Sequence, residues 1–311
     1  MLPPRLVRMP RVLHTAQALV DVILEIDELP PRGGNANARS ERWYAGGAVT
    51  TLIAAARTGA EAVHGGAHGT GPHGDLIREA LARDGVILSD EIRPDVDTGY
   101  CTVLLEPSAE RTFLTVYGAE RQITAESLAT LAPQPGDLVC ISGYSLFEPT
   151  RDPLLEFLET LPEGVDVVLD PGDPFADFPR ELQRRVLART TVWTSNADEA
   201  RALTDLDDLE DTPEAIRRRL APGAAVVVRD GDRGCLVFHH GRGTQIPAFP
   251  QKAVDTNGAG DTHTGVMLAE RALGADWESA ATRANAAAGI AVTRHGTESA
   301  PTRAEVDEFL A

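Results

Sequence analysis

Four apolar segments in the second half of the chain constrain the fold most strongly. Residues 137–142, 165–169, 191–194 and 224–229 are short and apolar along most of their length, and helical patterns lie between them. Strands of this kind are buried on both faces, and strands that alternate with helices form parallel sheets covered by those helices. The pattern therefore predicts an α/β fold with a mostly parallel central sheet.

A second, smaller sheet is expected from strands that lie outside this alternation. Residues 11–26 contain the strand candidate VDVILEI, and residues 99–117 form two predicted strands joined by a polar turn at 107–111. No low-complexity linker or internal repeat divides the chain, so we expect one domain over residues 1–311. The strands of its lid are expected at about residues 12–44 and 95–120.

The composition argues against several classes of function. A net charge of −18 disfavours nucleic acid or an anionic membrane surface as a partner. Three widely spaced cysteines without a CxxC motif fit the reducing cytoplasm, and no apolar run predicts a signal peptide or a membrane span. Alanine follows the one lysine, Lys252, so the P-loop motif GK[ST] is absent and arginine, backbone N–H groups or metal must neutralise any phosphate.

The segment AVDTNGAGDTHTG at residues 253–265 combines a glycine turn with the start of a predicted helix. The turn consists of Gly258, Ala259 and Gly260, and the helical pattern runs from Thr262 onward. The first N–H groups of a helix lack intrahelical partners and carry the positive end of the helix dipole, so they bind anions such as phosphate. Asp261 at this position is either a helix cap or a base that accepts a proton from an attacking hydroxyl.

Polar residues also follow the predicted strands. Asn196 and Glu199, in the sequence NADE, have the spacing of a capping box, but their oxygens equally suit Mg²⁺ bound to phosphates. Asp170 ends a predicted strand, although its sequence DPGDP is also typical of a turn. Gly231 follows a strand as well and would let a nucleotide approach the backbone.

The sequence GTGPHG at residues 69–74 has the formal pattern GxGxxG of a dinucleotide-binding loop. Pro72 lies inside it, and the acids that follow, Asp90 and Glu91, precede a turn-like RPD instead of ending a strand, so the pattern only weakly supports a nicotinamide cofactor. His64, His68 and His73 lie nearby, but Gly65 and Gly66 disfavour a helical pair of zinc ligands.

The segment DTNGAGDTHTG resembles the C-terminal signature of the PfkB, or ribokinase-like, carbohydrate kinases. Other segments fall in the order of that family: Asp21 before a Pro/Gly turn, AGGAVTT, GAHGTGPHG, SGY, NADE and ANAAAGIAVTRHG. The resemblance implies a three-layer α/β/α ribokinase-like fold with a small β-sheet lid. It also implies ATP-dependent phosphorylation of a sugar hydroxyl, a primary one, by a homodimer that forms through the lid.

The resemblance also implies roles for the matching residues. The catalytic base would be Asp261, and the anion hole would consist of the N–H groups of Gly258, Ala259 and Gly260. The residues implied to bind sugar are Asp21, Gly46, Gly47 and Thr50. Those implied to bind ATP are Asn196, Glu199, Gly231 and Asn285, with Glu199 reaching Mg²⁺ through water. A loop for a monovalent cation, potassium, would consist of Asp255, Asn257, Ala291, Gly296 and Ser299.

Four positions depart from the family pattern and leave the substrate open. Thr50 (or Thr51) replaces an asparagine that contacts sugar, Leu19 replaces a polar residue of ribose-specific members, and Arg229 replaces a threonine. His263 replaces a phenylalanine and is interpreted as a partly buried helix histidine. The alternatives are a nucleoside kinase of the same family, an NAD(P)-dependent oxidoreductase that uses GTGPHG, and a non-catalytic sensor of sugar or nucleotide.

Overall fold

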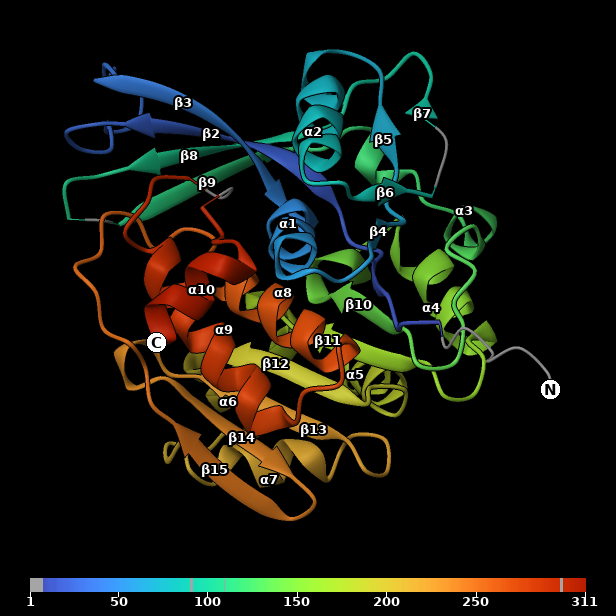
Figure 1. Ribbon diagram of the computed structural model, residues 1–311. Helices are drawn as coiled ribbons and strands as arrows, with labels where there is room; N and C mark the ends of the chain where they lie inside the picture. Colours follow the sequence, from blue (N-terminus) through green and yellow to red (C-terminus); the bar gives the residue numbers. More distant parts are fainter. Residues whose placement is uncertain (1–7, 90–91, 109, 297–298) are drawn as a thin grey trace.

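The computed structural model describes residues 8–89, 92–108, 110–296 and 299–311. A nine-stranded sheet has the order β15-β14-β13-β12-β11-β10-β1-β4-β6 (Figure 1). The strands from β13 to β6 are parallel, and β14 and β15 add an antiparallel edge. The strands are β1 (Val12–His14), β4 (Ala62–His64), β6 (Ile87–Leu88), β10 (Leu138–Ser142), β11 (Asp166–Asp170), β12 (Val192–Asn196), β13 (Ala225–Arg229), β14 (Cys235–His239) and β15 (Arg242–Ile246).

Helices cover both faces of this sheet, because successive residues of its strands point into two separate cores. On β10, Leu138 and Cys140 belong to one core, and Val139 and Ile141 belong to the other. The first core lies under α1 (Ala48–Thr58), α8 (Ala259–Ala272), α9 (Trp277–Ala291) and α10 (Arg303–Leu310). The second lies under α3 (Ala125–Ala129), α4 (Arg151–Thr160), α5 (Arg180–Leu187), α6 (Ala197–Thr204) and α7 (Thr212–Arg217). The predicted three-layer fold and its four central strands are confirmed.

The small sheet has the order β3-β2-β8-β9 and projects from one end of the large sheet (Figure 1). Its strands are β2 (Ala18–Glu25), β3 (Ser40–Gly47), β8 (Tyr100–Leu105) and β9 (Arg111–Val116). The two strands predicted within residues 99–117 are present as β8 and β9, which pair in antiparallel fashion, and part of the predicted turn at 107–111 lies outside the described residues. The small sheet takes β2 and β3 from the first predicted lid segment, whereas Val12–His14, at the start of that segment, pairs with β10 and β4 in the large sheet.

The helix α2 (Pro72–Arg83) packs against one face of the small sheet. The ring of His73 lies between those of Trp43 and Tyr100, with centroid distances of 5.3 and 5.1 Å. The remaining elements are the strands β5 (His68–Gly69) and β7 (Ile92–Arg93) and the 3₁₀ helices η1 (Ala119–Arg121), η2 (Gly143–Leu146), η3 (Asp173–Asp177) and η4 (Gly231–Arg233). The opposite face of the small sheet carries a small apolar cluster of Ile23, Cys101 and Val103.

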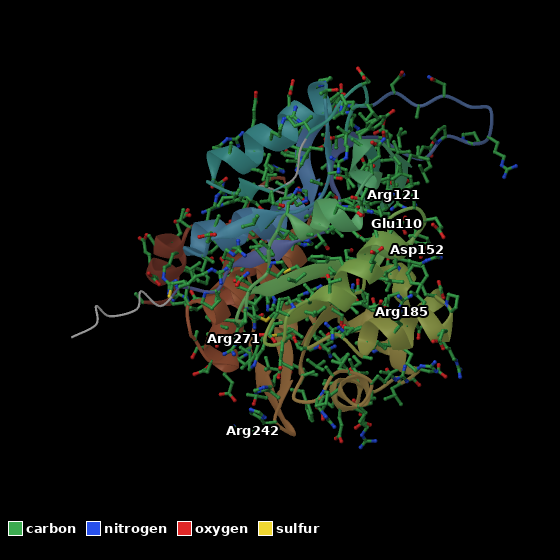
Figure 2. The ribbon with its side chains drawn as sticks, turned by 90° about the vertical axis from the view of Figure 1, so that its right-hand side faces the viewer. Glu110, Arg121, Asp152, Arg185, Arg242 and Arg271 are labelled. Atoms are coloured by element: carbon green, nitrogen blue, oxygen red, sulfur yellow. The ribbon has the colours of Figure 1, made fainter. Side chains whose placement is uncertain are left out.

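Charged side chains link neighbouring elements at the surface (Figure 2). Arg185 of α5 pairs with Glu159 of α4 at 2.5 Å, and Arg271 at the end of α8 lies over the ring of Trp277 at 4.4 Å. An exposed ion pair such as Arg185–Glu159 contributes about 0–1 kcal/mol. No helix among the described residues is both long and apolar enough to cross a membrane.

Small residues let α1 and α8 approach closely, and this contact positions the start of α8. A Cβ atom on Gly265 would lie 2.2 Å from the carbonyl oxygen of Thr51 and 2.8 Å from the Cβ of Ala54. The glycine is therefore required by packing, because its conformation is that of an ordinary helix residue.

Gly265→Ala is expected to destabilise the protein by about 1–3 kcal/mol, because the added methyl group overpacks the α1–α8 contact. Helix propensity alone predicts the opposite, a gain of about 1 kcal/mol. Urea unfolding measures the difference. Gly243→Ala in β15 is the control, because its Cβ would meet only Phe238, at 3.5 Å. A more stable Gly265→Ala protein would contradict the packing argument.

Candidate active site

Three neighbouring parallel strands end in polar side chains at one edge of the large sheet. Asp170 is the last residue of β11, Asn196 of β12 and Arg229 of β13, and the last two are paired in register. Ligands of open α/β sheets bind outside the carboxyl ends of the strands. The structure therefore places these side chains where a ligand is expected.

A cavity of about 500 Å³ opens at this edge, between β13, the start of α8 and α9. The side chains and backbone that line it include Asn196, Arg229, Gly231, Gly260, His263 and Asn285. Three residues predicted to bind ATP, namely Asn196, Gly231 and Asn285, are therefore brought to one cavity although they come from three separate segments.

The start of α8 has the geometry that the glycine turn predicts. Gly258 is the N-cap residue with φ of +73°, a conformation that favours glycine. The N–H of Ala259 makes a long hydrogen bond of 3.4 Å to the Thr256 carbonyl. Among the described residues, the N–H groups of Gly258 and Gly260 have no acceptor. These backbone donors at a positive helix end form an anion site.

Asp261 lies in the first turn of α8, beside this anion site. Burial raises the pKa of Asp261 to about 6, and the negative charge of Asp170 raises it further. Arg229 and a hydrogen bond from Thr51 act in the opposite direction. A hydrogen bond from the backbone N–H of Asp261 to its own carboxylate also lowers this pKa, so the side chain contacts the start of the helix as a cap would.

Asp21 of β2 points away from α2, toward the carboxyl edge of the large sheet. Burial raises its pKa to about 7, and the second cause is the charge of Asp261, so the two carboxylates lie within electrostatic reach. Gly46 makes room for Asp21, because a Cβ at Gly46 would lie 2.3 Å from its Oδ2 atom. The glycine pair in AGGAVTT thus lies at the end of β3 and shapes the surroundings of Asp21.

Gly47 and Thr50, which are also predicted to bind sugar, lie at the start of α1. Gly47 is the N-cap of α1 with φ of +63°, and a Cβ there would meet the Gln17 carbonyl at 2.5 Å. The Thr50 side chain is buried, and its hydroxyl has no hydrogen-bond partner among the described residues. A buried hydroxyl without a hydrogen-bond partner lowers the stability of the fold unless a ligand or a water molecule forms a hydrogen bond with it.

Asn196 and Glu199 form the capping box that their spacing predicts. The Asn196 side chain accepts from the Glu199 N–H at 2.8 Å, and Glu199 Oε2 accepts from the Asn196 N–H at 2.8 Å. Burial raises the pKa of Glu199 to about 7, with Asp170 as the next cause. One carboxylate oxygen of Glu199 remains outside the cap and is available to a ligand.

Arg229 is held firmly at the edge of the cavity. Its Nη1 donates to the hydroxyls of Thr194 at 2.6 Å and Thr264 at 3.0 Å, and its Nη2 lies 3.5 Å from Asp170 Oδ2. Burial raises the pKa of Asp170, against the opposing charge of Arg229. The sequence marks Arg229 only as a departure from a pattern; its position at the end of an apolar strand was the available signal.

Asn285 and His263 lie deeper in the cavity wall. The amide nitrogen of Asn285 donates to the carbonyls of Ile246 and Pro247 at 3.1 and 3.0 Å, so it fixes the chain after β15. His263 is fully buried rather than partly buried, and neither ring nitrogen has a hydrogen-bond partner among the described residues. Burial lowers its pKa to about 3, which keeps the ring neutral.

The segments of the predicted cation loop also meet. Asp255 accepts from the Asn257 N–H at 2.9 Å and from the Gly296 N–H at 3.1 Å. The carbonyl of Ala291 accepts from the Arg294 N–H, and the Ser299 hydroxyl is buried without a partner among the described residues. Oxygen atoms from both sides of the loop are thus present.

Arg111 of β9 connects the small sheet to the signature segment. Its Nη2 donates to Thr256 Oγ1 at 3.2 Å and lies 3.4 Å from Asp255 Oδ1. This contact joins the small sheet to the segment that precedes α8.

The GTGPHG segment does not form an anion site. The carboxylate of Asp97 accepts from the N–H groups of His73 and Gly74 at 3.2 and 2.9 Å, so an acid of the chain itself already fills the start of α2. The nearby His64 and His68 bond to each other at 2.7 Å. Within the described ranges, no group of three or more potential metal-binding His, Cys, Asp or Glu side chains is found.

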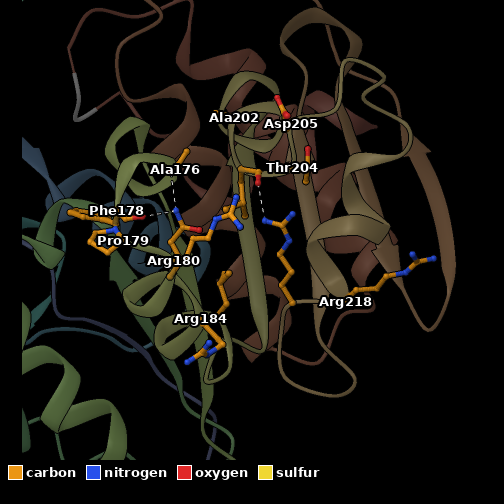
Figure 3. Close-up of a pocket in the computed structure, with 13 residues that line it drawn as sticks. Ala176, Phe178, Pro179, Arg180, Arg184, Ala202, Thr204, Asp205 and Arg218 are labelled. Carbon is orange, nitrogen blue, oxygen red and sulfur yellow. Dashed lines mark hydrogen bonds between the residues drawn. The ribbon is translucent and has the colours of Figure 1, made fainter.

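A larger cavity of about 1080 Å³ lies elsewhere, between α5, α6 and α7 (Figure 3). Two of its polar side chains donate hydrogen bonds to backbone carbonyls. Gln183 donates to the carbonyls of Ala176 and Phe178, and Arg219 donates to that of Leu203. None of the predicted site residues lines it, so its size does not indicate the site of chemistry.

Comparisons with known proteins agree with this geometry. Residues 9–303 match the sequence profile of the pfkB family of carbohydrate kinases. The uncharacterised sugar kinase YegV of Escherichia coli K12 is 34% identical over 97% of this chain and 95% of its own length. The ATP-dependent ribose-1-phosphate kinase of Halopiger xanaduensis is 31% identical over 97% of this chain and 98% of its own.

Among solved structures, Arabidopsis thaliana ribokinase in complex with ribose and ATP superimposes with a TM-score of 0.82. It is 25% identical and covers 97% of this chain and 99% of its own. The resemblance that the sequence indicates at DTNGAGDTHTG is confirmed. The chain therefore belongs to the pfkB family of carbohydrate kinases and is an ATP-dependent sugar kinase.

Proposed function

We propose that this kinase transfers the γ-phosphate of ATP to a primary hydroxyl of its sugar, with Asp261 as the base. The observation that carries the proposal is that Asp261 lies in the first turn of α8, beside the unpaired amides, and close enough to Asp21 for its charge to raise the pKa of that residue. A base with a pKa of about 6 is largely ionised at neutral pH and still accepts a proton efficiently.

In the proposed step, the acceptor O–H gives its proton to Asp261 as its oxygen attacks the γ-phosphorus. The new O–P bond forms while the bond from the γ-phosphorus to the β–γ bridging oxygen breaks, and ADP leaves. The N–H groups of Gly258, Ala259 and Gly260 stabilise the charge of the phosphoryl group during transfer.

The sugar would lie between the small sheet and the start of α8. Asp21 accepts hydrogen bonds from its hydroxyls, and Thr50 supplies the hydroxyl that has no partner within the protein. Gly46 and Gly47 let the sugar approach the backbone, because neither carries a side chain at the crowded end of β3. These contacts orient the acceptor toward Asp261.

Hard oxygen ligands at the sheet edge suit Mg²⁺. Glu199 would hold the hydrated ion through the oxygen outside its helix cap, with Asn196 beside it. When bound, Mg²⁺ neutralises part of the phosphate charge of ATP. For a monovalent cation we propose the oxygens near Asp255, Asn257, Ala291, Gly296 and Ser299, of which the buried Ser299 hydroxyl is still unpaired within the described residues.

The inner face of the small sheet favours a second candidate, a nucleoside kinase of the same family. Ile23, Cys101 and Val103 form an apolar cluster there with Leu19 and Tyr44, on the face that carries Asp21. An apolar surface beside a hydroxyl-binding acid suits a base attached to a ribose. ADP release with pentoses, ketohexoses, acidic sugars, ribose 1-phosphate and nucleosides decides between the candidates. Absence of turnover with every acceptor would reject the kinase function.

The small sheet also supports the proposal of a homodimer. Its edge strand β9 exposes Phe113, Leu114 and Val116, and Tyr117 follows it. Long exposed apolar edges are usually covered by a partner. Light scattering of the purified protein tests the dimer. We place the kinase in the cytoplasm, since Cys101, Cys140 and Cys235 are buried free thiols.

Asp261→Asn is expected to lower kcat by about 10²–10⁴-fold, because the amide cannot accept the proton of the attacking hydroxyl. The Kd for ATP, measured by calorimetry, should change little. Asp276→Asn is the matched control, because Asp276 only caps α9 and asparagine caps equally well. Wild-type turnover by the Asp261→Asn enzyme would refute the assignment of the base.

Asp21→Asn is expected to stabilise the protein and to abolish acceptor binding. The native pKa of Asp21, about 7, exceeds its unfolded value of 3.8, so the stability linked to its protonation is present at low pH and is lost as the pH rises through 7. The gain from the neutral amide should be larger at pH 8 than at pH 5, by ~1–3 kcal/mol. Denaturant unfolding at both pH values measures the gain, and an equal gain at both would contradict the buried-charge argument.

A further inference from the structure

The guanidinium of Arg229 has donors that the protein does not use. Both N–H bonds of Nη1 are satisfied by Thr194 and Thr264, and Nη2 faces Asp170 at 3.5 Å. Nε has no acceptor among the described residues. An arginine carries five N–H donors in a rigid fork, so one edge of this fork is left for a ligand.

That free edge faces the anion site at the start of α8. A Cβ built on Gly260 would lie 3.4 Å from Nε and 3.5 Å from Nη2 of Arg229. Arg229, Gly260 and Asn196 line the same cavity of about 500 Å³. The backbone donors of α8 and the side-chain donors of β13 therefore converge from two elements.

The acidic residues around the cavity favour a positively charged group at this place. Asp170, Glu199 and Asp261 all lie close enough to Arg229 for its charge to lower their pKa values. These acids would repel a nucleotide polyphosphate. The one lysine, Lys252, is exposed and does not line the cavity, whereas Arg229 is fixed there by three elements.

We propose that Arg229 binds the terminal phosphates of ATP through Nε and Nη2, as a fixed cation that completes the anion site of α8. The proposal rests on the proposed kinase function and adds a residue to its nucleotide site. Thr194 and Thr264 hold the fork in place, so little side-chain entropy is lost when phosphate binds. A bidentate arginine–phosphate contact is among the strongest hydrogen-bonded pairs.

The competing explanation is that Arg229 only stabilises the packing of β12, β13 and α8. Loss of a purely structural residue would lower the affinity for every ligand of the cavity equally, whereas loss of a phosphate contact would lower the affinity only for ligands with β- or γ-phosphates. Calorimetric titration with ATP, ADP and AMP separates the two roles, using wild type, Arg229→Met and Arg233→Met. Arg233 is the control, because it lies four residues further on, pairs with Asp230 and does not line the cavity.

For Arg229→Met we expect Kd for ATP and ADP to rise by about 10–100-fold, as for one lost charge-assisted contact, and Kd for AMP to change by less than about 2-fold. Arg233→Met should match wild type for all three. If Arg229→Met does not fold, Arg229→Lys is used. The lysine ammonium keeps the positive charge but lacks the planar fork of arginine, so a smaller loss of affinity, confined to ATP and ADP, is expected.

Equal losses for all three nucleotides, or no loss for any, would overturn the assignment of Arg229 and leave the kinase function intact. A wild-type protein that binds no ATP and phosphorylates no acceptor would instead remove the kinase proposal itself. The two failures are therefore distinguishable from the wild-type titration alone.

Discussion

Burial of acids at the carboxyl edge of the large sheet is the constraint on which the rest of the site depends. Asp21, Asp170, Glu199 and Asp261 are partly withdrawn from water, and burial is the largest cause of the raised pKa of each. Clustered buried carboxylates destabilise a fold unless positive charge or protons compensate them. Arg229 and the dipole of α8 supply positive charge, and the raised pKa values of Asp21, Glu199 and Asp261, about 7, 7 and 6, reduce the negative charge that remains near neutral pH.

The packing of glycine and alanine makes this arrangement possible. Gly265 lets α8 touch α1, and Gly46 lets Asp21 fit beneath β3. Both contacts set the position of a carboxylate, Asp261 in one case and Asp21 in the other. The small residues in these segments therefore position the two carboxylates as well as fill the core. Their replacement is expected to move reacting groups, whose positioning matters at the scale of an ångström.

Much of the fold followed from local patterns, because those patterns report burial directly. Apolar strands buried on both faces predicted β10 to β13, and the turn at Gly258 predicted the start of α8. The capping-box spacing of Asn196 and Glu199 was also observed. The sequence could not show that Val12–His14 belongs to the large sheet, since a three-residue strand is defined by its neighbours β4 and β10.

The role of Arg229 could not be predicted for a similar reason. Its fork is fixed by Thr194 and Thr264, each 35 residues away in the chain, and its charge acts on acids from three other segments. The start of α2 shows the opposite case, where a glycine motif predicts an anion site but Asp97, distant in sequence, already fills it. In both cases, long-range contacts decide the chemistry of a local pattern.

The central claim is that the negative charge of Asp261 reaches Asp21 and makes the ionisation of Asp21 more costly. A ¹³C NMR titration of protein labelled at aspartate carboxyl carbons tests it directly, with the two signals assigned from the Asp21→Asn and Asp261→Asn variants. The account predicts that these signals titrate at about 7 and about 6, and that the pKa of Asp21 falls when Asp261 is neutralised. Titration of both below about pH 5, or an Asp21 that is indifferent to Asp261, would contradict it.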